Sequence, residues 1–196
     1  MKNRYILFLI LGLDVIVLLF QTRELSISYY EASLLYGSFS ALQAIVKTSI
    51  YFFGQSDFAL RLPMILFHLF SAILLYEISK KYVKKEKNRT WLILVFVLLP
   101  GVMSSALIVN SAGLVLFGLL LFVYIYEKYS IKLIYPLLIA YLFVDGGFVY
   151  LFLALTVFSL YKKDKTFFIF NLVLFLVSLS LFGIDTHGSP RGHFLD

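Results

Sequence analysis

Long apolar runs alternate with short polar or basic segments along most of this 196-residue chain. About twenty apolar residues in a helix are enough to cross the ~30 Å hydrocarbon core of a bilayer. The pattern therefore predicts an all-α membrane protein with about seven transmembrane helices. The predicted spans are residues 5–20, 58–79, 90–108 (with a kink at Pro100-Gly101), 112–126, two short helices within 133–161, and 166–183.

Residues 21–57 are amphipathic rather than continuously apolar. Residues 28–37 and 39–53 each have the length and mixed polarity of a helix that lies along the membrane interface. Lys47, in the second of these, can extend its ammonium group to water. The sequence predicts two interfacial helices here. The alternative is that residues 39–53 form a short span, which would invert the topology of everything that follows.

Residues 133–161 allow two interpretations. One continuous helix would be about 43 Å long, which is too long for the bilayer core without strong tilt. It would also place Asp145-Gly146-Gly147 at its centre. Two short helices joined by a turn at these residues avoid both problems, although each is shorter than the membrane is thick. We expect the two-helix hairpin.

Basic residues gather in alternate loops between the predicted spans. The largest group is in residues 80–89, which carry six Lys and Arg residues. Cytoplasmic loops of membrane proteins are enriched in these residue types. The sequence therefore predicts a multi-pass protein of the inner or plasma membrane with a cytoplasmic N-terminus. In this topology residues 1–196 form a single polytopic domain, with 21–57 as an outer segment and 184–196 as an outer tail.

The composition supports a membrane protein and argues against several other classes. The chain is 61% hydrophobic and 14% charged, against about 45–50% apolar and 25% charged residues in soluble domains. The net charge is +6, but Lys and Arg lie in short runs between apolar stretches, so we expect the lipid bilayer and no nucleic acid as a partner. The chain has no Cys, which excludes disulfides and thiolate chemistry.

Asp14 and His68 are ionisable residues well inside predicted spans. Asp14 lies in the middle of the first span, where a carboxyl group is costly and by default faces a bundle interior or a cavity. The alternative for Asp14 is a neutral or paired packing carboxyl. His68 is expected to be a packed or helix-bonded imidazole.

Side chains able to do chemistry collect on the predicted outer side. The Arg61 guanidinium suits a lipid phosphate because it offers paired donors. Glu31 or Asp145 suits a general base that takes a proton from an acceptor hydroxyl. The plainer alternatives are a solvated helix carboxylate for Glu31, a lipid anchor for Arg61, and a turn residue for Asp145. Asp185, His187 and His193 match no ligand spacing, so no metal site is predicted.

One motif resembles a known family. Residues 53–63, FGQSDFALRLP, resemble the first luminal loop and second helix of polyprenyl-phosphate-sugar glycosyltransferases of the C-type membrane fold, in the protein O-mannosyltransferase and aminoarabinose transferase branches. Those proteins have a span, an interfacial helix with an Asp-Glu-Ala motif, a second interfacial helix, and then Phe-Gly-x-Ser-Glu-Phe-Ala-x-Arg-Leu-Pro. The order here is similar, and Lys47 falls at the spacing before Gly54 where relatives often carry lysine.

The resemblance implies the fold of the N-terminal half of a C-type glycosyltransferase. It implies transfer of a sugar from a polyprenyl-phosphate donor at the outer membrane face, with a divalent metal in some branches. On this interpretation the catalytic candidates are Glu31 and Asp145. The substrate-binding candidates are Tyr30, Lys47, Arg61, Asn110 and Arg191.

The sequence departs from the family pattern at several motifs. Tyr30-Glu31-Ala32 replaces Asp-Glu-Ala, so the usual catalytic aspartate is absent. Ser38-Phe39-Ser40 stands where a basic residue and two prolines are expected, and relatives are much longer. The alternatives are therefore a catalytically inactive membrane protein that binds a lipid carrier or a partner subunit, a fragment of a longer transferase, and, more distantly, a small transporter.

Overall fold

The computed structural model describes residues 2–36, 40–129 and 131–182, and every regular element within them is a helix. The chain divides into two compact units, Met1–Ile134 and Tyr135–Asp196, where the sequence predicts one polytopic domain. The elements of the first unit are α1 (Lys2–Glu24), α2 (Tyr29–Tyr36), α3 (Ala41–Phe53), α4 (Asp57–Tyr82), α5 (Glu86–Leu98), α6 (Pro100–Leu107), α7 (Ser111–Lys128) and the 3-10 helix η1 (Ile131–Leu133). The second unit contains α8 (Ile134–Leu142), η2 (Gly146–Phe148), α9 (Val149–Lys162) and α10 (Lys165–Phe182).

Four helices in the described part of the chain are long and apolar enough to cross a membrane. They are residues Tyr5–Glu24 of α1, and α4, α7 and α10. Helices α5 and α6 qualify together as a fifth, broken span, bent by 60°. The bend confirms the kink predicted at Pro100, which begins α6. The all-helical membrane class is therefore supported, with four or five candidate spans rather than about seven.

The difference in span number comes from the final third of the chain. The predicted hairpin is present as two helices, α8 with 9 residues and α9 with 14, separated by a turn and η2. The continuous-helix interpretation of residues 133–161 is thus wrong. Neither helix alone has the ~20 residues that a crossing needs, so counting each as a span overestimated the total.

Helix α4 is the central element of the first unit. It packs against α1, α3, α5, α6 and α7. Half of the 18-residue apolar stretch of α4 is buried, against 22% of the corresponding stretches of α1 and α7. Helix α4 is therefore the helix around which the others assemble. Near the basic end of the unit, Leu7 and Leu11 of α1 belong to one buried cluster with Ala72 and Tyr76 of α4.

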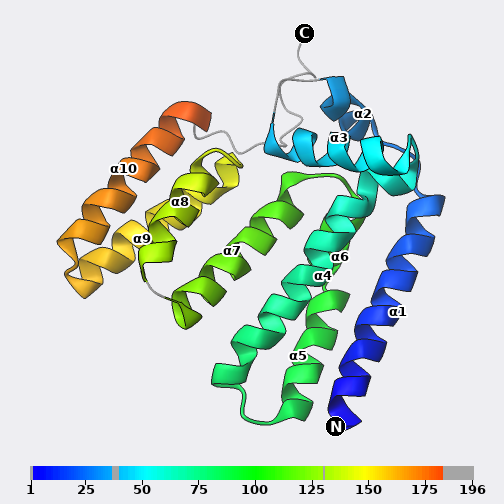
Figure 1. Cartoon of the computed structure of the whole chain (residues 1–196), viewed down its shortest axis with the longest axis horizontal. Helices are drawn as coiled ribbons and strands as arrows, with labels where there is room; N and C mark the ends of the chain where they lie inside the picture. The colour runs from blue at the N-terminus through cyan, green and yellow to red at the C-terminus, as the bar shows by residue number, and fades with distance from the viewer. Residues whose placement is uncertain (1, 37–39, 130, 183–196) are drawn as a thin grey trace. The chain divides into compact units, whose positions relative to one another are not determined.

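The turn between α3 and α4 follows directly from its residues. Gly54 ends α3 with φ of 80°, in the left-handed region that favours glycine. Ser56 caps α4 by accepting a hydrogen bond from the Ala59 N–H, and Asp57 is the acidic residue of the first turn. The tight turn folds α3 back across the start of α4, where Figure 1 shows it.

Pro63 leaves a free carbonyl in α4 to which α3 can form a hydrogen bond. Proline has no N–H, so the Ala59 carbonyl four residues earlier lacks its helical donor. The Ser49 hydroxyl of α3 donates to this carbonyl at 2.6 Å. Leu42 and Val46 of α3 are buried in the same interface. The helices predicted at residues 28–37 and 39–53 are thus present as α2 and α3, and their position along a membrane interface stays a prediction.

The second unit is built on the pairing of α9 with α10. Their buried faces carry polar side chains, including Thr156, Ser159 and Asn171. The Asn171 amide donates to the Phe167 carbonyl of its own helix at 2.7 Å. The Thr156 and Ser159 hydroxyls likewise donate to carbonyls of α9, so these buried polar groups have hydrogen-bond partners within their own helices.

A close approach between α6 and α7 yields the first prediction. A Cβ added at Gly113 would lie 3.0 Å from the Ser105 carbonyl oxygen. We expect Gly113→Ala to destabilise the protein by about 1–3 kcal/mol, because the two backbones must separate. Chemical unfolding in mixed micelles measures this cost. The control is Gly12→Ala in α1, where a Cβ meets no atom within 4 Å. Equal stability of the two variants would contradict the close packing.

Candidate functional site

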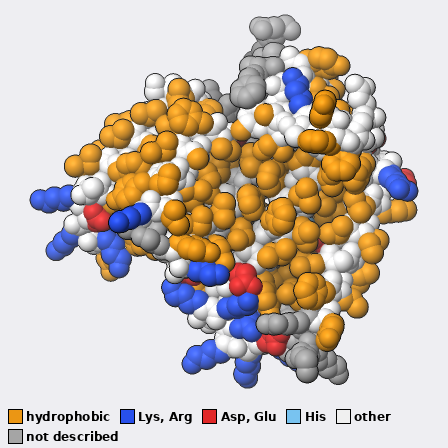
Figure 2. Space-filling model, viewed as in Figure 1, with side chains coloured by type: hydrophobic (Ala, Val, Ile, Leu, Met, Phe, Trp, Pro, Cys, Tyr) orange, Lys and Arg blue, Asp and Glu red, His pale blue; other side chains and the backbone are white. Residues whose placement is uncertain are grey.

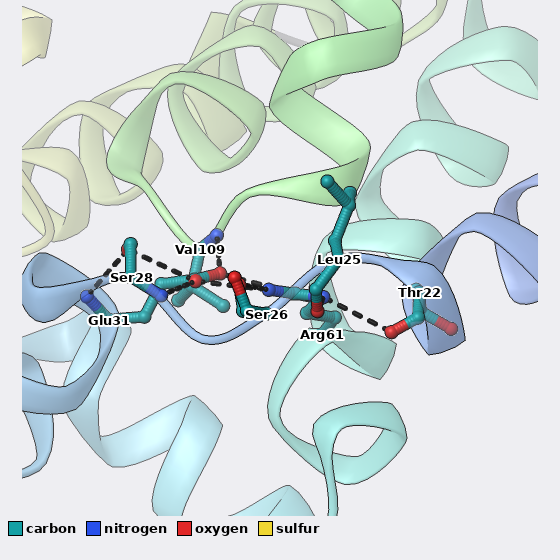
Figure 3. A network of polar contacts seen from close by, with 7 residues as sticks. All are labelled: Thr22, Leu25, Ser26, Ser28, Glu31, Arg61 and Val109. Carbon is teal, nitrogen blue, oxygen red and sulfur yellow. Dashed lines mark hydrogen bonds and ion pairs between the residues drawn. The ribbon is translucent and has the colours of Figure 1, made fainter.

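The Arg61 guanidinium is the centre of the largest polar network in the described residues. Arg61 lies just over one turn into α4 and is only 1% exposed. Its Nε donates to Glu31 Oε1 at 3.2 Å, and its Nη2 donates to Glu31 Oε2 at 3.1 Å. The remaining three N–H groups donate to backbone carbonyls at the end of α1 and in the segment that follows it. These are the carbonyls of Thr22, Leu25 and Ser26, at 3.2, 2.8 and 3.0 Å. All five guanidinium donors therefore have protein acceptors (Figure 3).

Glu31 is held in place by its own helix. Ser28 and Glu31 form a reciprocal cap at the start of α2. The Glu31 N–H donates to Ser28 Oγ at 3.2 Å, and the Ser28 N–H donates to Glu31 Oε2 at 2.9 Å. This is the capping box that a Ser-x-x-Glu sequence forms at a helix N-terminus. The Ser28 hydroxyl also donates to Oε2 at 3.1 Å.

A third segment reaches the Glu31 carboxylate. The Val109 N–H, in the connection between α6 and α7, donates to Oε1 at 3.0 Å. With the two bonds from Arg61 and the two from Ser28, the carboxylate accepts five hydrogen bonds. Four separate parts of the chain thus meet at one ion pair: the end of α1 with the segment after it, the start of α2, α4, and the α6–α7 connection (Figure 3).

The network fixes the charge of Glu31. Burial by itself raises the pKa of this carboxyl, but hydrogen bonds from Arg61, Ser28 and Val109 outweigh burial, so its pKa lies below the ordinary value of 4.5. Glu31 is therefore ionised at neutral pH. An ionised carboxylate with low basicity and a full set of donors is suited to holding a structure together. To accept a proton from a substrate, it would first have to lose one of these bonds.

The other predicted site residues are placed differently. Lys47 is exposed on α3 and forms no ion pair with any described residue. Asn110 caps α7, with its Oδ1 accepting from the Ala112 N–H at 3.0 Å. It directly follows Val109, so it lies beside the Glu31 network along the chain. Tyr30 is the neighbour of Glu31 in α2, but its side chain lies outside the described residues.

Asp145 belongs to the second unit. Its Oδ1 accepts from the Gly147 N–H at 2.7 Å, which caps η2. This is the turn-forming geometry that the sequence allowed for Asp145 as an alternative to a base. Arg191 lies outside the described residues, as do Asp185, His187 and His193. The structure therefore brings together Glu31 and Arg61 among the predicted residues.

Sequence reasoning missed a second buried pair. His68 Nε2 of α4 lies 2.8 Å from Asp14 Oδ2 of α1, and both side chains are almost fully buried. The His68 ring also stacks on Phe96, with 6.3 Å between ring centroids. The positions of the two residues within their helices could have predicted this contact. Asp14 lies ten residues before the end of α1 at Glu24, and His68 lies eleven residues after the start of α4 at Asp57. In antiparallel neighbours these positions have the same depth.

No three His, Asp or Glu side chains converge as a metal site within the described parts of the chain. The divalent metal implied by the family resemblance has no ligand cluster there. The sequence matches no protein-family model, and no curated protein or solved structure matches the chain.

The Asp14–His68 pair gives the second prediction. Asp14→Leu alone leaves a buried imidazole without its partner, and we expect a loss of about 1–2 kcal/mol, the range of interhelical hydrogen bonds in membranes. The double variant Asp14→Leu/His68→Leu should recover most of that loss, because both polar groups are then removed. Unfolding of the single and double variants in the same detergent measures the coupling. Additive losses would show that the pair has no energetic connection.

Proposed function

We propose that this chain is a glycosyltransferase-like integral membrane protein that binds a polyprenyl-phosphate carrier at its outer interface, and in which Glu31 and Arg61 build the binding platform. The observation that carries this proposal is the mutual saturation of these two residues. Arg61 has no N–H left for a lipid phosphate, and Glu31 has five donors on its two oxygens. The binding platform consists of α2 and α3, which the ion pair and Ser49 hold against α4.

Lys47 is the cation that supports phosphate binding on this platform. It is exposed on α3 and has no carboxylate partner among the described residues. Tyr51 and Phe52 follow on the same helix with 84% and 72% of their surface exposed. A cation next to exposed aromatic rings suits a phosphate that carries an apolar tail, because both parts of the lipid then have a partner at the interface.

A second candidate is sugar transfer with Glu31 as the base. It is favoured by the motif order around residues 53–63. The lowered pKa of Glu31 keeps the carboxylate ionised, although it also makes the carboxylate a weaker base. In that reaction Glu31 takes the proton of an acceptor hydroxyl, the hydroxyl oxygen bonds to the anomeric carbon, and the polyprenyl phosphate leaves with the electrons of the broken bond. Glu31 would have to release Arg61 or Val109 first.

The third prediction separates the two candidates. Reconstituted wild-type protein is expected to bind a fluorescent polyprenyl phosphate, and Lys47→Gln is expected to weaken binding about five-fold, the effect of one interfacial charge worth ~1 kcal/mol. Lys84→Gln, at the other end of the first unit, is the matched control and should bind normally. The same preparations are tested for sugar transfer to membrane acceptors.

Binding without transfer supports the carrier-binding proposal. Transfer by wild type that disappears in a folded Glu31→Gln variant would contradict it and establish the second candidate. Unchanged binding in Lys47→Gln would remove Lys47 from the site.

The fourth prediction concerns the ion pair itself. Glu31→Leu or Arg61→Met leaves one buried partner uncompensated and should cost about 3–5 kcal/mol of stability, whereas the double variant Glu31→Leu/Arg61→Met should cost clearly less than the two single changes combined. Because the pKa of Glu31 is lowered on folding, its contribution is complete above pH 4.5 and is lost as the pH falls below that value. Unfolding at pH 7 and pH 4 measures both effects. A cycle with no coupling energy would contradict the structural assignment.

A further inference from the structure

An apolar groove of about 380 Å³ lies between α1 and α5, away from the Glu31–Arg61 network. It is lined by Ile6 and Ile10 of α1 and by Lys87, Thr90, Trp91 and Leu94 of α5. These residues lie in the first half of α1 and at the start of α5, so the groove is at the end of the unit that carries the α4–α5 connection. Figure 2 shows Lys and Arg side chains gathered at this end, beside a mostly hydrophobic surface.

Among the described residues, the groove has apolar walls and a single charged group, that of Lys87. Ile6, Ile10 and Leu94 supply aliphatic walls, and Trp91 is 55% exposed at the surface. The Thr90 hydroxyl is already used, because it donates to the Glu86 carbonyl of its own helix. Lys87 precedes Trp91 by four residues, about one helical turn. The two side chains therefore lie on the same face of α5.

Lys87 shares with Lys84 and Lys85 the absence of a carboxylate partner among the described residues, and of these three only Lys87 lines the groove. Lys80 pairs with Glu77, and Lys81 pairs with Glu127. Arg89 donates to the Val83 carbonyl and lies over the Tyr76 ring. Lys87 has no carboxylate within ion-pair distance among the described residues, and it is exposed. The groove therefore combines a slot for a hydrocarbon chain with an unneutralised cation next to it.

We propose that this groove binds one anionic phospholipid, with an acyl chain between α1 and α5 and its phosphate at Lys87. An aliphatic groove accepts the acyl chain of any phospholipid, so the charge decides the preference. A lipid with net negative charge gains the attraction of Lys87, worth ~1 kcal/mol near a membrane surface. A zwitterionic lipid brings its own cation and gains less. The exposed indole suits the headgroup level, where tryptophan is enriched in membrane proteins. This site shares no residue with the proposed carrier platform.

The chain offers a direct probe of this site, because Trp91 is its only tryptophan. The full chain is reconstituted in vesicles that contain brominated phosphatidylglycerol or brominated phosphatidylcholine at equal mole fraction. Bromine quenches tryptophan fluorescence only at short range, so quenching reports the lipid in the groove. We expect a relative binding constant about five-fold higher for phosphatidylglycerol, the equivalent of ~1 kcal/mol.

Three variants make the test specific. Lys87→Gln should bring the ratio for the two lipids close to one, whereas Lys84→Gln, in the same connection but not lining the groove, should leave the preference intact. Ile10→Phe should reduce quenching by both lipids, because the larger side chain fills the slot. Circular dichroism confirms that each variant keeps its helices.

Three results would overturn the proposal. They are equal quenching of the wild type by both lipids, an equal loss of preference in Lys84→Gln and Lys87→Gln, and full quenching in Ile10→Phe. The second would assign the preference to the diffuse charge of the connection rather than to the groove.

Discussion

The buried ion pair between Glu31 and Arg61 is the constraint on which the arrangement of the first unit depends. A guanidinium removed from water is stable only when all of its donors are satisfied, and a carboxylate supplies two acceptors at most in this geometry. The remaining three acceptors must come from backbone. The segment from Thr22 to Ser26 supplies them by turning its carbonyls toward Arg61. The path of the chain after α1 is therefore set by the needs of one side chain in α4.

The contact between α1 and α4 is polar at one end and apolar at the other. At one end, the Arg61 network joins the two helices through charge and backbone carbonyls. Seven residues further along α4, two helical turns, His68 meets Asp14 of α1. Beyond that pair the contact is apolar, with Leu11 of α1 and Ala72 of α4 in one cluster. The polar partners fix the register of the two helices, and apolar packing fills the part near the basic connection.

Local features of this fold could be predicted from the sequence. The apolar runs predicted the helices, and Pro100 marked the bend. Glu31 and Arg61 were both identified as residues of interest. Their pairing was not, because it joins positions thirty residues apart and uses backbone carbonyls, which no side-chain pattern reveals. The Asp14–His68 contact was missed because it joins two helices, and the matching depth of these residues is visible only once α1 and α4 are known to be antiparallel neighbours.

Two further differences have physical explanations. The number of spans was overestimated because apolar composition does not distinguish a short helix from a crossing one, and only length decides this for α8 and α9. The chemical assignment of Glu31 rested on its residue type and its place in a motif. The donors that occupy its carboxylate come from Ser28, Arg61 and Val109, and only the folded chain brings the last two to it.

Amide hydrogen exchange across α2 tests most directly whether the ion pair holds α2 against α4. The measurement compares residues 29–36 in the wild type and in Arg61→Gln, with α5 of the same samples as an internal reference. The account predicts slow exchange of α2 in the wild type and much faster exchange in the variant, while α5 is unchanged. Equal protection of α2 in the two proteins would show that the helix is held by other contacts and would contradict the account.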